Sequence, residues 1–155
     1  MTKIGIADTT FARVDMAKFA IKTLKEALNE SHIVRYTVPG VKDLPVACKK
    51  LFEEEKCDII MALGMIGKEP IDKMCGHEAS QGIIQTQLMT NKHILEVFVH
   101  LDEGKTEKEV YEIAINRVTK HSLNAVALLE GRVALQPYAG KGRRQGKDDV
   151  GEIRI

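Results

Sequence analysis

The chain has 155 residues, of which 23 are Lys or Arg and 22 are Asp or Glu, so its formal net charge is +1. This balanced charge produces no basic field, and we therefore expect neither nucleic acid nor an anionic membrane as a partner. The length predicts one domain with its own hydrophobic core. No signal peptide or membrane-spanning apolar run is recognisable, which favours a cytoplasmic protein. Three cysteines without paired spacing are expected to be reduced and to pack in the core: Cys48, Cys57 and Cys75.

Four apolar runs are expected to form strands, and each is followed by apolar residues at helical spacing. The strands are expected at residues 3–8, 33–38, 59–63 and 93–101, and the helices at about 15–30, 43–56, 71–89 and 106–129. Thr106 and Glu109 form a potential capping box at the start of the last helix, and Gly131 is suited to ending it. Alternating strands and helices with short links predict a parallel sheet with right-handed crossovers. The expected fold is α/β, a flavodoxin-like three-layer α/β/α arrangement around a four-stranded parallel sheet.

Polar or aromatic residues follow three of these strands. Phe11 lies in the loop after the first strand, Asp43 follows the Pro39-Gly40 turn after the second, and a glycine-rich loop around Gly67 follows the third. In an open parallel sheet, ligands bind outside the carboxyl ends of the strands, so these residues are candidates for a binding site. Asp43 has two interpretations, because a carboxylate before Pro45 is also suited to capping a helix.

The composition changes after residue 131. Residues 132–155 form a tail rich in glycine and charge, and we expect no packed structure of its own there. Two interpretations remain open for the tail. It is either a solvated end of the chain or a strap that becomes ordered across a neighbouring subunit or a ligand.

Four motifs follow one another along the chain. They are Phe11 after the first strand, the run Val38-Pro39-Gly40-Val41-Lys42-Asp43-Leu44-Pro45, Ala62-Leu63-Gly64 with its glycine loop, and Glu78-Ala79-Ser80-Gln81-Gly82-Ile83. Together they resemble the lumazine synthase family over roughly residues 3–130, which implies a lumazine synthase-like domain at residues 1–131. Residues 8–13, residues 85–100 and the glycine-rich tail are similar to the archaeal-type riboflavin synthase branch of that family.

The loop after the third strand departs from the lumazine synthase pattern. That family has a phosphate-binding loop followed by a histidine, whereas this chain has Gly67, Lys68, Glu69, Pro70 and Ile71. A carboxylate repels phosphate, and isoleucine cannot transfer a proton. The resemblance therefore implies a riboflavin synthase, whose substrate carries no phosphate. Such an enzyme transfers a four-carbon unit between two molecules of 6,7-dimethyl-8-ribityllumazine and releases riboflavin and 5-amino-6-ribitylamino-pyrimidinedione.

The resemblance also implies roles for residues at the strand ends. Phe11 matches an aromatic residue that stacks on the heterocycle, although a place in the core is the alternative, and Thr10 beside it is assigned to the substrate as well. Asp43 replaces a glutamate that binds the ribityl chain. Main-chain groups that face the ring are assigned to Met65, Ile66 and Gly67.

Other residues are assigned to catalysis or to a neighbouring subunit. Arg117 and His121 share a helical face and resemble basic residues that reach the adjacent subunit's site, although a solvated basic face is the alternative. Glu96 is expected at a subunit interface against the neighbour's ligand. Lys68 and Glu69 are assigned to the second lumazine, with a solvated loop pair as the alternative. The resemblance implies a homopentamer with shared sites.

The cofactor and function predictions draw on both the residues and the resemblance. No organic cofactor is needed, and no His, Cys and carboxylate set has metal-ligand spacing, although the branch is associated with Mg²⁺. Two other functions remain open. They are a lumazine synthase with an altered loop and a non-catalytic flavodoxin-like binding module.

Overall fold

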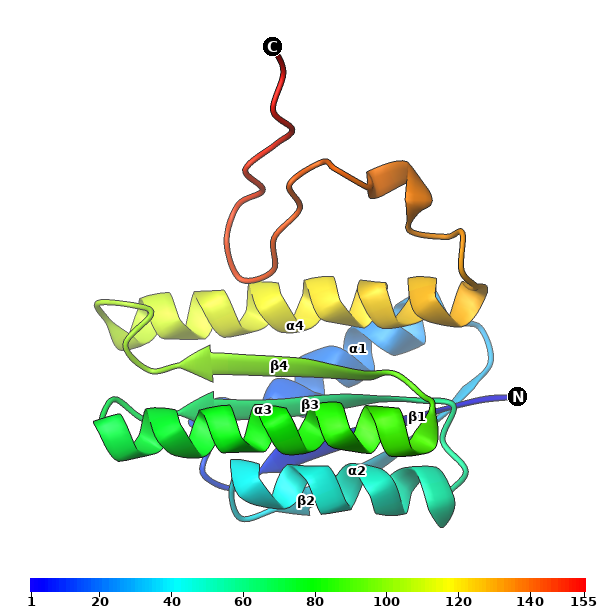
Figure 1. The fold of residues 1–155 in the computed structure, drawn as a ribbon, viewed down its shortest axis with the longest axis horizontal. Helices are drawn as coiled ribbons and strands as arrows, with labels where there is room; N and C mark the ends of the chain where they lie inside the picture. Colours follow the sequence, from blue (N-terminus) through cyan, green and yellow to red (C-terminus); the bar gives the residue numbers. More distant parts are fainter.

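The computed structural model describes residues 1–155 and contains one parallel sheet between two layers of helices (Figure 1). The strands are β1 (Thr2–Thr9), β2 (Ser31–Val38), β3 (Ile59–Ile66) and β4 (Ile94–His100), in the spatial order β2-β1-β3-β4. The helices are α1 (Met16–Ala27), α2 (Leu44–Glu53), α3 (Pro70–Thr90) and α4 (Glu107–Glu130), with short 3-10 helices at Val41–Asp43 and Gln136–Tyr138. All three strand pairs are parallel, as predicted.

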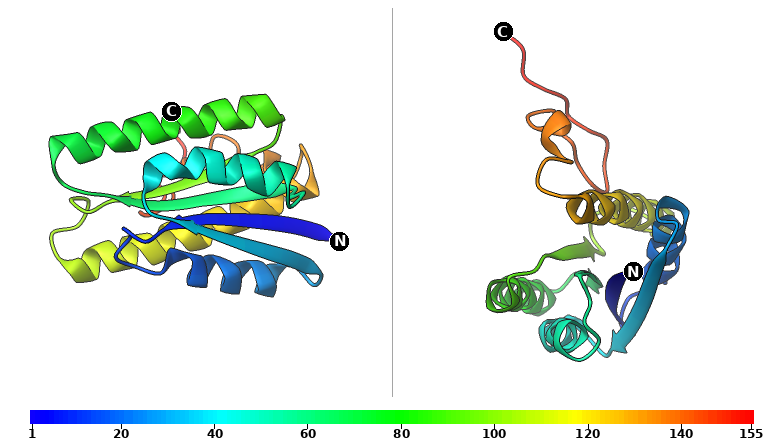
Figure 2. Two further views of the ribbon diagram at one scale, coloured as in Figure 1. Left: turned by 90° about the horizontal axis from the view of Figure 1, so that it is seen from below. Right: turned by 90° about the vertical axis from the view of Figure 1, so that its right-hand side faces the viewer.

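Two hydrophobic cores lie on opposite faces of the sheet. Successive strand residues point to opposite faces, so Met61 contributes to the core beneath α1 and α4, while its neighbours Ile60 and Ala62 contribute to the core beneath α2 and α3. The end-on view in Figure 2 shows these two helix pairs on either side of the sheet. The central strand β3 is buried along its whole length. The predicted three-layer fold is therefore confirmed.

Several element boundaries differ from the predictions for local reasons. β3 continues three residues beyond position 63, because its end pairs with β4 up to Ile66 and His100. Helix α1 ends at Ala27, since Leu28 adopts an extended backbone. Helix α2 ends at Glu53, and Lys56 has a positive φ of 59°, which a right-handed helix cannot include.

The predicted capping box of α4 is only half correct. Thr106 Oγ1 accepts a hydrogen bond from Glu109 N at 3.1 Å, as expected for an N-cap. The Glu109 carboxylate, however, accepts from Lys105 N at 2.6 Å instead of from the amide of Thr106. At the other end, Gly131 ends the helix with φ 130°, as predicted.

The tail forms no core of its own, but part of it packs against the domain. It forms a short 3-10 helix, and a later segment returns to the outer surface of α4 before the chain runs away from the domain (Figure 1). Gly146 in this segment is buried, and its amide donates to Asn116 Oδ1 of α4 at 2.9 Å. The tail is therefore not a wholly solvated end, because polar side chains of α4 satisfy part of its backbone.

The cysteines are free, but they do not all occupy the core. Cys48 and Cys57 are buried as predicted, and burial raises their pKa values to about 12 and about 11. Cys75 is only partly buried and lines a cavity, so its assignment as a packing residue was wrong.

No helix of this chain has the length and apolar character needed to cross a membrane.

Candidate active site

A cavity of about 370 Å³ lies beyond the carboxyl ends of β1 and β3, and we name it the strand-end cavity. It brings together five of the residues predicted to contact the substrate, namely Phe11, Asp43, Met65, Ile66 and Gly67. The Phe11 side chain is 51% exposed, which excludes the alternative that it belongs to the core. Met65 and Ile66 are instead buried residues at the end of β3 that line the cavity.

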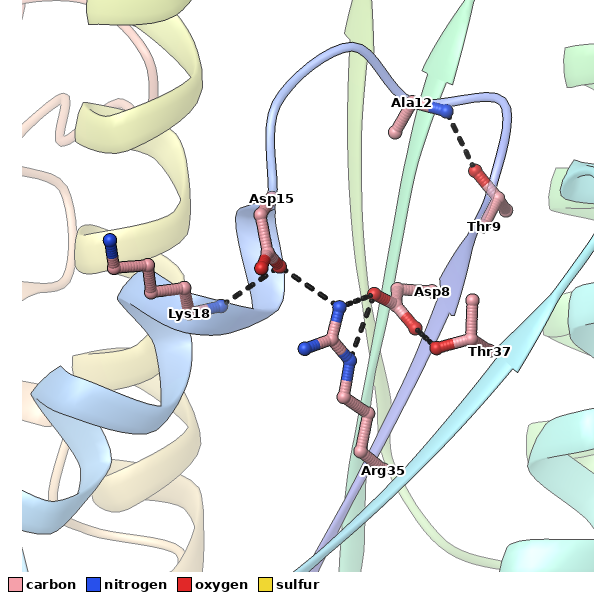
Figure 3. Close-up of polar contacts among 7 residues, drawn as sticks. All are labelled: Asp8, Thr9, Ala12, Asp15, Lys18, Arg35 and Thr37. Atoms are coloured by element: carbon pink, nitrogen blue, oxygen red, sulfur yellow. Dashed lines mark hydrogen bonds and ion pairs between the residues drawn. The ribbon is translucent and has the colours of Figure 1, made fainter.

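The loop that carries Phe11 is held by a network of one buried and two exposed charged side chains (Figure 3). Arg35 of β2 donates to Asp8 Oδ2 from Nη2 at 2.6 Å and from Nε at 3.1 Å. The same Nη2 donates to Asp15 Oδ1 at 2.9 Å, and Asp15 is the N-cap of α1. Asp8 is only 5% exposed, and Thr37 Oγ1 donates to its other oxygen at 2.6 Å. One guanidinium therefore ties together both ends of the Phe11 loop.

Shorter contacts fix the loop itself. Thr9 Oγ1 accepts from Ala12 N at 3.2 Å, and Arg13 N donates to Met65 Sδ at 3.3 Å. Thr10 is exposed and does not line the strand-end cavity, because its hydroxyl donates to Pro39 O at 3.2 Å. Thr10 thus joins the loops that follow β1 and β2. Its contact is with Pro39, which lines the cavity.

Asp43 has a free carboxylate at the wall of this cavity. It occupies the N-cap position of α2, but its side chain makes no capping hydrogen bond, and it forms no ion pair. Its backbone amide instead donates to Gly40 O at 3.1 Å and closes the 3-10 turn. The interpretation of Asp43 as a helix cap therefore fails, and the exposed carboxylate remains available to a ligand.

Lys68 and Glu69 lie outside the strand-end cavity. Glu69 precedes α3, where its amide donates to Asp72 Oδ2 at 3.1 Å. Lys68 instead lines a separate hollow of about 400 Å³ together with Arg13 and Lys105.

The Asp72 carboxylate packs so closely over Gly67 that a Cβ on Gly67 would lie 2.3 Å from Asp72 Oδ2. The loop after β3 thus needs glycine for its own packing, apart from any approach to a ligand.

A second cavity of about 520 Å³ runs along the outer edge of β4, and we name it the β4-edge cavity. It brings together Glu96 of β4 with Arg117 and His121 of α4. Burial raises the pKa of Glu96, although a hydrogen bond with Ser80 and the nearby His100 oppose the rise. The sequence analysis assigned Arg117 and His121 to one helical face and treated Glu96 separately as an interface residue of a strand, and the structure brings all three to the same cavity.

His121 is neutral at physiological pH, because burial and the nearby Arg117 charge lower its pKa to about 4. The side-chain amide nitrogen of Asn124 lies 3.4 Å from His121 Nδ1. An amide nitrogen can only donate, so this contact suits the neutral tautomer in which Nδ1 accepts and Nε2 carries the proton. In this tautomer, His121 donates a hydrogen bond from Nε2 without carrying a charge.

Arg117 is held within its own chain instead of being a solvated basic residue. Its Nη1 and Nη2 donate to the two oxygens of Glu103 at 2.7 and 2.8 Å, and Nη1 also donates to Phe98 O at 2.9 Å. Its Nε donates to Gln145 O in the tail at 3.1 Å. Burial would raise the pKa of Glu103, but the hydrogen bonds from Arg117 and from His100 N outweigh it and lower the pKa. Glu103 and Gln145 were not predicted, and no sequence spacing links them to Arg117.

The two cavities share no lining residue. The first turns of α3 separate them, with Asp72 and Cys75 on the side of the strand-end cavity and Lys73, Gly76 and His77 on the other. Apart from Thr10, Lys68 and Glu69, the predicted site residues therefore form two separate groups within one chain.

Comparison with known proteins assigns the family. The family model described as 6,7-dimethyl-8-ribityllumazine synthase matches residues 1–130. A riboflavin synthase of Methanothermobacter thermautotrophicus is 55% identical, and one of Methanothermobacter marburgensis is 54% identical; each alignment covers 99% of this chain and 100% of the relative. A riboflavin synthase of Archaeoglobus fulgidus is 50% identical over 97% of this chain and 98% of its own. The chain therefore belongs to the 6,7-dimethyl-8-ribityllumazine synthase family and, within it, to the archaeal-type riboflavin synthases.

Proposed function

We propose that this protein is a riboflavin synthase, which converts two molecules of 6,7-dimethyl-8-ribityllumazine to riboflavin and 5-amino-6-ribitylamino-pyrimidinedione. The observation that carries the proposal is the identity of 50 to 55% with relatives named riboflavin synthase over nearly the whole of both chains. The loop after β3 supports it as well. The Glu69 carboxylate repels phosphate, Ile71 cannot transfer a proton, and the riboflavin synthase substrate carries no phosphate.

We propose that the complete active site is formed between two neighbouring subunits of a homo-oligomer, with a homopentamer as the expected assembly. The strand-end cavity of one chain would face the β4-edge cavity of the next. This arrangement would unite the two groups of predicted residues that one chain keeps apart. Such head-to-tail contacts form a closed ring when the rotation between subunits closes.

In the strand-end cavity, Phe11 would stack on the heterocycle of one lumazine. The free carboxylate of Asp43 would accept hydrogen bonds from the hydroxyl groups of the ribityl chain, as an ionised carboxylate is suited to do. Thr10 would act indirectly, through its hydrogen bond to Pro39 O. This cavity would thus fix one ring and its ribityl chain.

The β4-edge cavity would contact the second lumazine or the far side of the first. His121 would donate from Nε2 to a ring nitrogen or oxygen that gains negative charge during the reaction. Glu96 would bind nearby, and Arg117 would hold one wall through Glu103. Lys68 and Glu69, exposed beyond the end of β3, would contact the second lumazine only in the assembled ring.

The substrate supplies much of the reactivity in this proposal. The methyl group on C7 of the lumazine is acidic, because the carbanion that forms when it loses a proton is delocalised into the heterocycle. The protein contributes mainly by holding two flat rings in contact, which can lower the barrier by several kcal/mol. The four-carbon transfer needs no organic cofactor, because one lumazine gains the unit that the other loses.

Mg²⁺ remains a prediction from the family resemblance. No group of three or more His, Cys, Asp or Glu side chains is arranged to hold a metal ion, so we derive no step through one. Assays with EDTA and with added Mg²⁺ test the requirement directly.

The decisive experiment supplies the purified chain with 6,7-dimethyl-8-ribityllumazine alone. Flavin absorbance should appear, and one riboflavin should form for every two lumazines consumed. Lumazine formation from the pyrimidine and dihydroxybutanone phosphate, without flavin formation, would favour a lumazine synthase instead. Tight lumazine binding with neither reaction would favour a non-catalytic flavodoxin-like module.

A further inference from the structure

The tail segment at residues 144–147 is bound to α4 through its main chain. Arg117 Nε donates to Gln145 O at 3.1 Å. Lys120, one turn further along the helix, donates from Nζ to Arg144 O at 3.1 Å and to Lys147 O at 2.9 Å. These carbonyl groups are therefore satisfied by α4, and the contacts do not depend on the side chains of the tail.

Gly146 lies at the centre of this contact. It is buried, its φ is 90°, and its amide donates to Asn116 Oδ1 at 2.9 Å. A Cβ at this position would lie 2.3 Å from Arg117 Nη2 and 2.4 Å from Arg117 Nε. Only glycine combines this backbone conformation with such a close approach, so the tail backbone packs directly on the guanidinium group.

Arg117 is therefore held on one side by the tail and on the other by residues that line the β4-edge cavity. Glu103 and Phe98 O accept from its terminal nitrogens, while Gln145 O accepts from Nε. Together these contacts leave only 13% of the Arg117 side chain exposed. An arginine side chain has many rotamers, and this two-sided contact selects one of them.

The position of this contact along the chain is informative. The model of the 6,7-dimethyl-8-ribityllumazine synthase family ends at residue 130, so it does not include the tail. The alignments with relatives named riboflavin synthase cover 97 to 99% of this chain and therefore reach into it. The contact between the tail and Arg117 thus belongs to the part that this chain shares with those relatives.

We propose that Gln145 and Gly146 are positioning residues of the active site, which hold Arg117 against Glu103 and so shape the wall of the β4-edge cavity that receives a lumazine. This inference rests on the proposed function and extends it to the tail. Without the tail contact, the guanidinium would be free to leave Glu103 and to move away from the cavity and from His121.

The main test compares two glycine variants. Gly146→Ala places a methyl group against Arg117, whereas Gly140→Ala is a matched control, because Gly140 also has a positive φ of 76° but nothing lies within 4 Å of its Cβ position. We expect Gly146→Ala to lower kcat about tenfold or more, since small displacements of positioning groups are costly. KM should change less than twofold, and Gly140→Ala should retain the kcat of the wild-type protein.

A second measurement does not depend on activity. The titration of His121, followed by NMR of its ring protons, reports the position of the Arg117 charge. Other charged or titratable groups that line the same cavity are Lys73 and His77 of α3, Glu96 and His100 of β4, and Glu103. These groups are unchanged in both variants. The pKa of His121 should rise in Gly146→Ala, as Arg117 moves away, and should stay unchanged in Gly140→Ala.

The outcomes separate the two proposals. If the wild-type protein forms no flavin, the proposed function fails, and the His121 titration still shows whether the tail positions Arg117. If Gly146→Ala matches Gly140→Ala in both kcat and titration, the role of the tail is refuted. If Gly146→Ala does not assemble, a chain ending at Arg143 replaces it. That chain should show the same loss of kcat and the same rise in pKa, and wild-type behaviour would refute the role.

Discussion

The strand-end cavity and the β4-edge cavity differ in how their residues are held. In the first, Phe11 and Asp43 lie directly after strands, and their positions follow from the course of the main chain. In the second, Arg117 is held by Glu103, by Phe98 O and by Gln145 O, which come from a loop, a strand and the tail. Variants in the first cavity should therefore affect binding and leave the fold intact. Variants in the second should affect stability and catalysis together.

The largest expected effect is the loss of Arg117. Arg117→Ala leaves the largely buried Glu103 without its partner, and we expect it to lower the free energy of unfolding by about 3 kcal/mol and to reduce flavin formation strongly. Urea unfolding and flavin assays measure the two effects. The double variant Arg117→Met, Glu103→Leu removes both charges and should recover most of the stability. Unchanged stability in Arg117→Ala would show that this ion pair does not hold the β4-edge cavity.

The loss of Phe11 should affect binding alone. Phe11→Ala should weaken lumazine binding by about 1 to 3 kcal/mol, through the lost stacking contact, as measured by fluorescence titration. Its urea midpoint should match that of the wild-type protein, because the ring is half exposed. Tyr36→Ala is a suitable control, since it removes an exposed aromatic residue from β2 outside both cavities. Equal lumazine affinities for the two variants would remove Phe11 from the site.

Mixing variants of the two cavities tests whether they meet between subunits. Asp43→Ala and His121→Ala should each form flavin slowly. In rings mixed at equal amounts, one interface in about four combines an intact Asp43 with an intact His121, so activity should rise to about a quarter of the wild-type value. Native mass spectrometry checks that the subunits have exchanged. Mixed rings no faster than their parents would place each site within one chain.

The smallest expected effect concerns the pH dependence of stability. The pKa of His121 is about 4 in the folded protein, below its ordinary value of 6.5, so the unfolded chain binds the proton more tightly. The contribution of neutral His121 to the free energy of unfolding is fully present above pH 6.5. This contribution decreases by roughly 1 to 3 kcal/mol as the pH falls toward 4. Urea unfolding between pH 4 and 7.5 measures the loss. His121→Gln should show a shallower decline over this range, and an equal decline would contradict the low pKa.

The comparison also shows which parts of the site could be predicted from the sequence. Phe11 and Asp43 were found because the ends of parallel strands meet at one edge of the sheet, and strands are recognisable from local apolar patterns. The same reasoning misplaced the end of β3, because the pairing with β4 that extends it to Ile66 is not a local property. The assignment of Thr10 to the substrate came from the family resemblance, and the structure shows that its hydroxyl donates to Pro39 O in the next loop.

The sequence by itself determined the order of strands and helices and the three-layer fold, because hydrophobic periodicity and turn residues act between near neighbours in the chain. The tertiary structure alone decided how Arg35 joins Asp8 to Asp15, and how Arg117 joins Glu103 to the tail. Glu103 lies 14 positions from Arg117, and Gln145 lies 28 positions from it. No periodicity connects such residues, because their contacts depend on where packing of the two cores places each element in space.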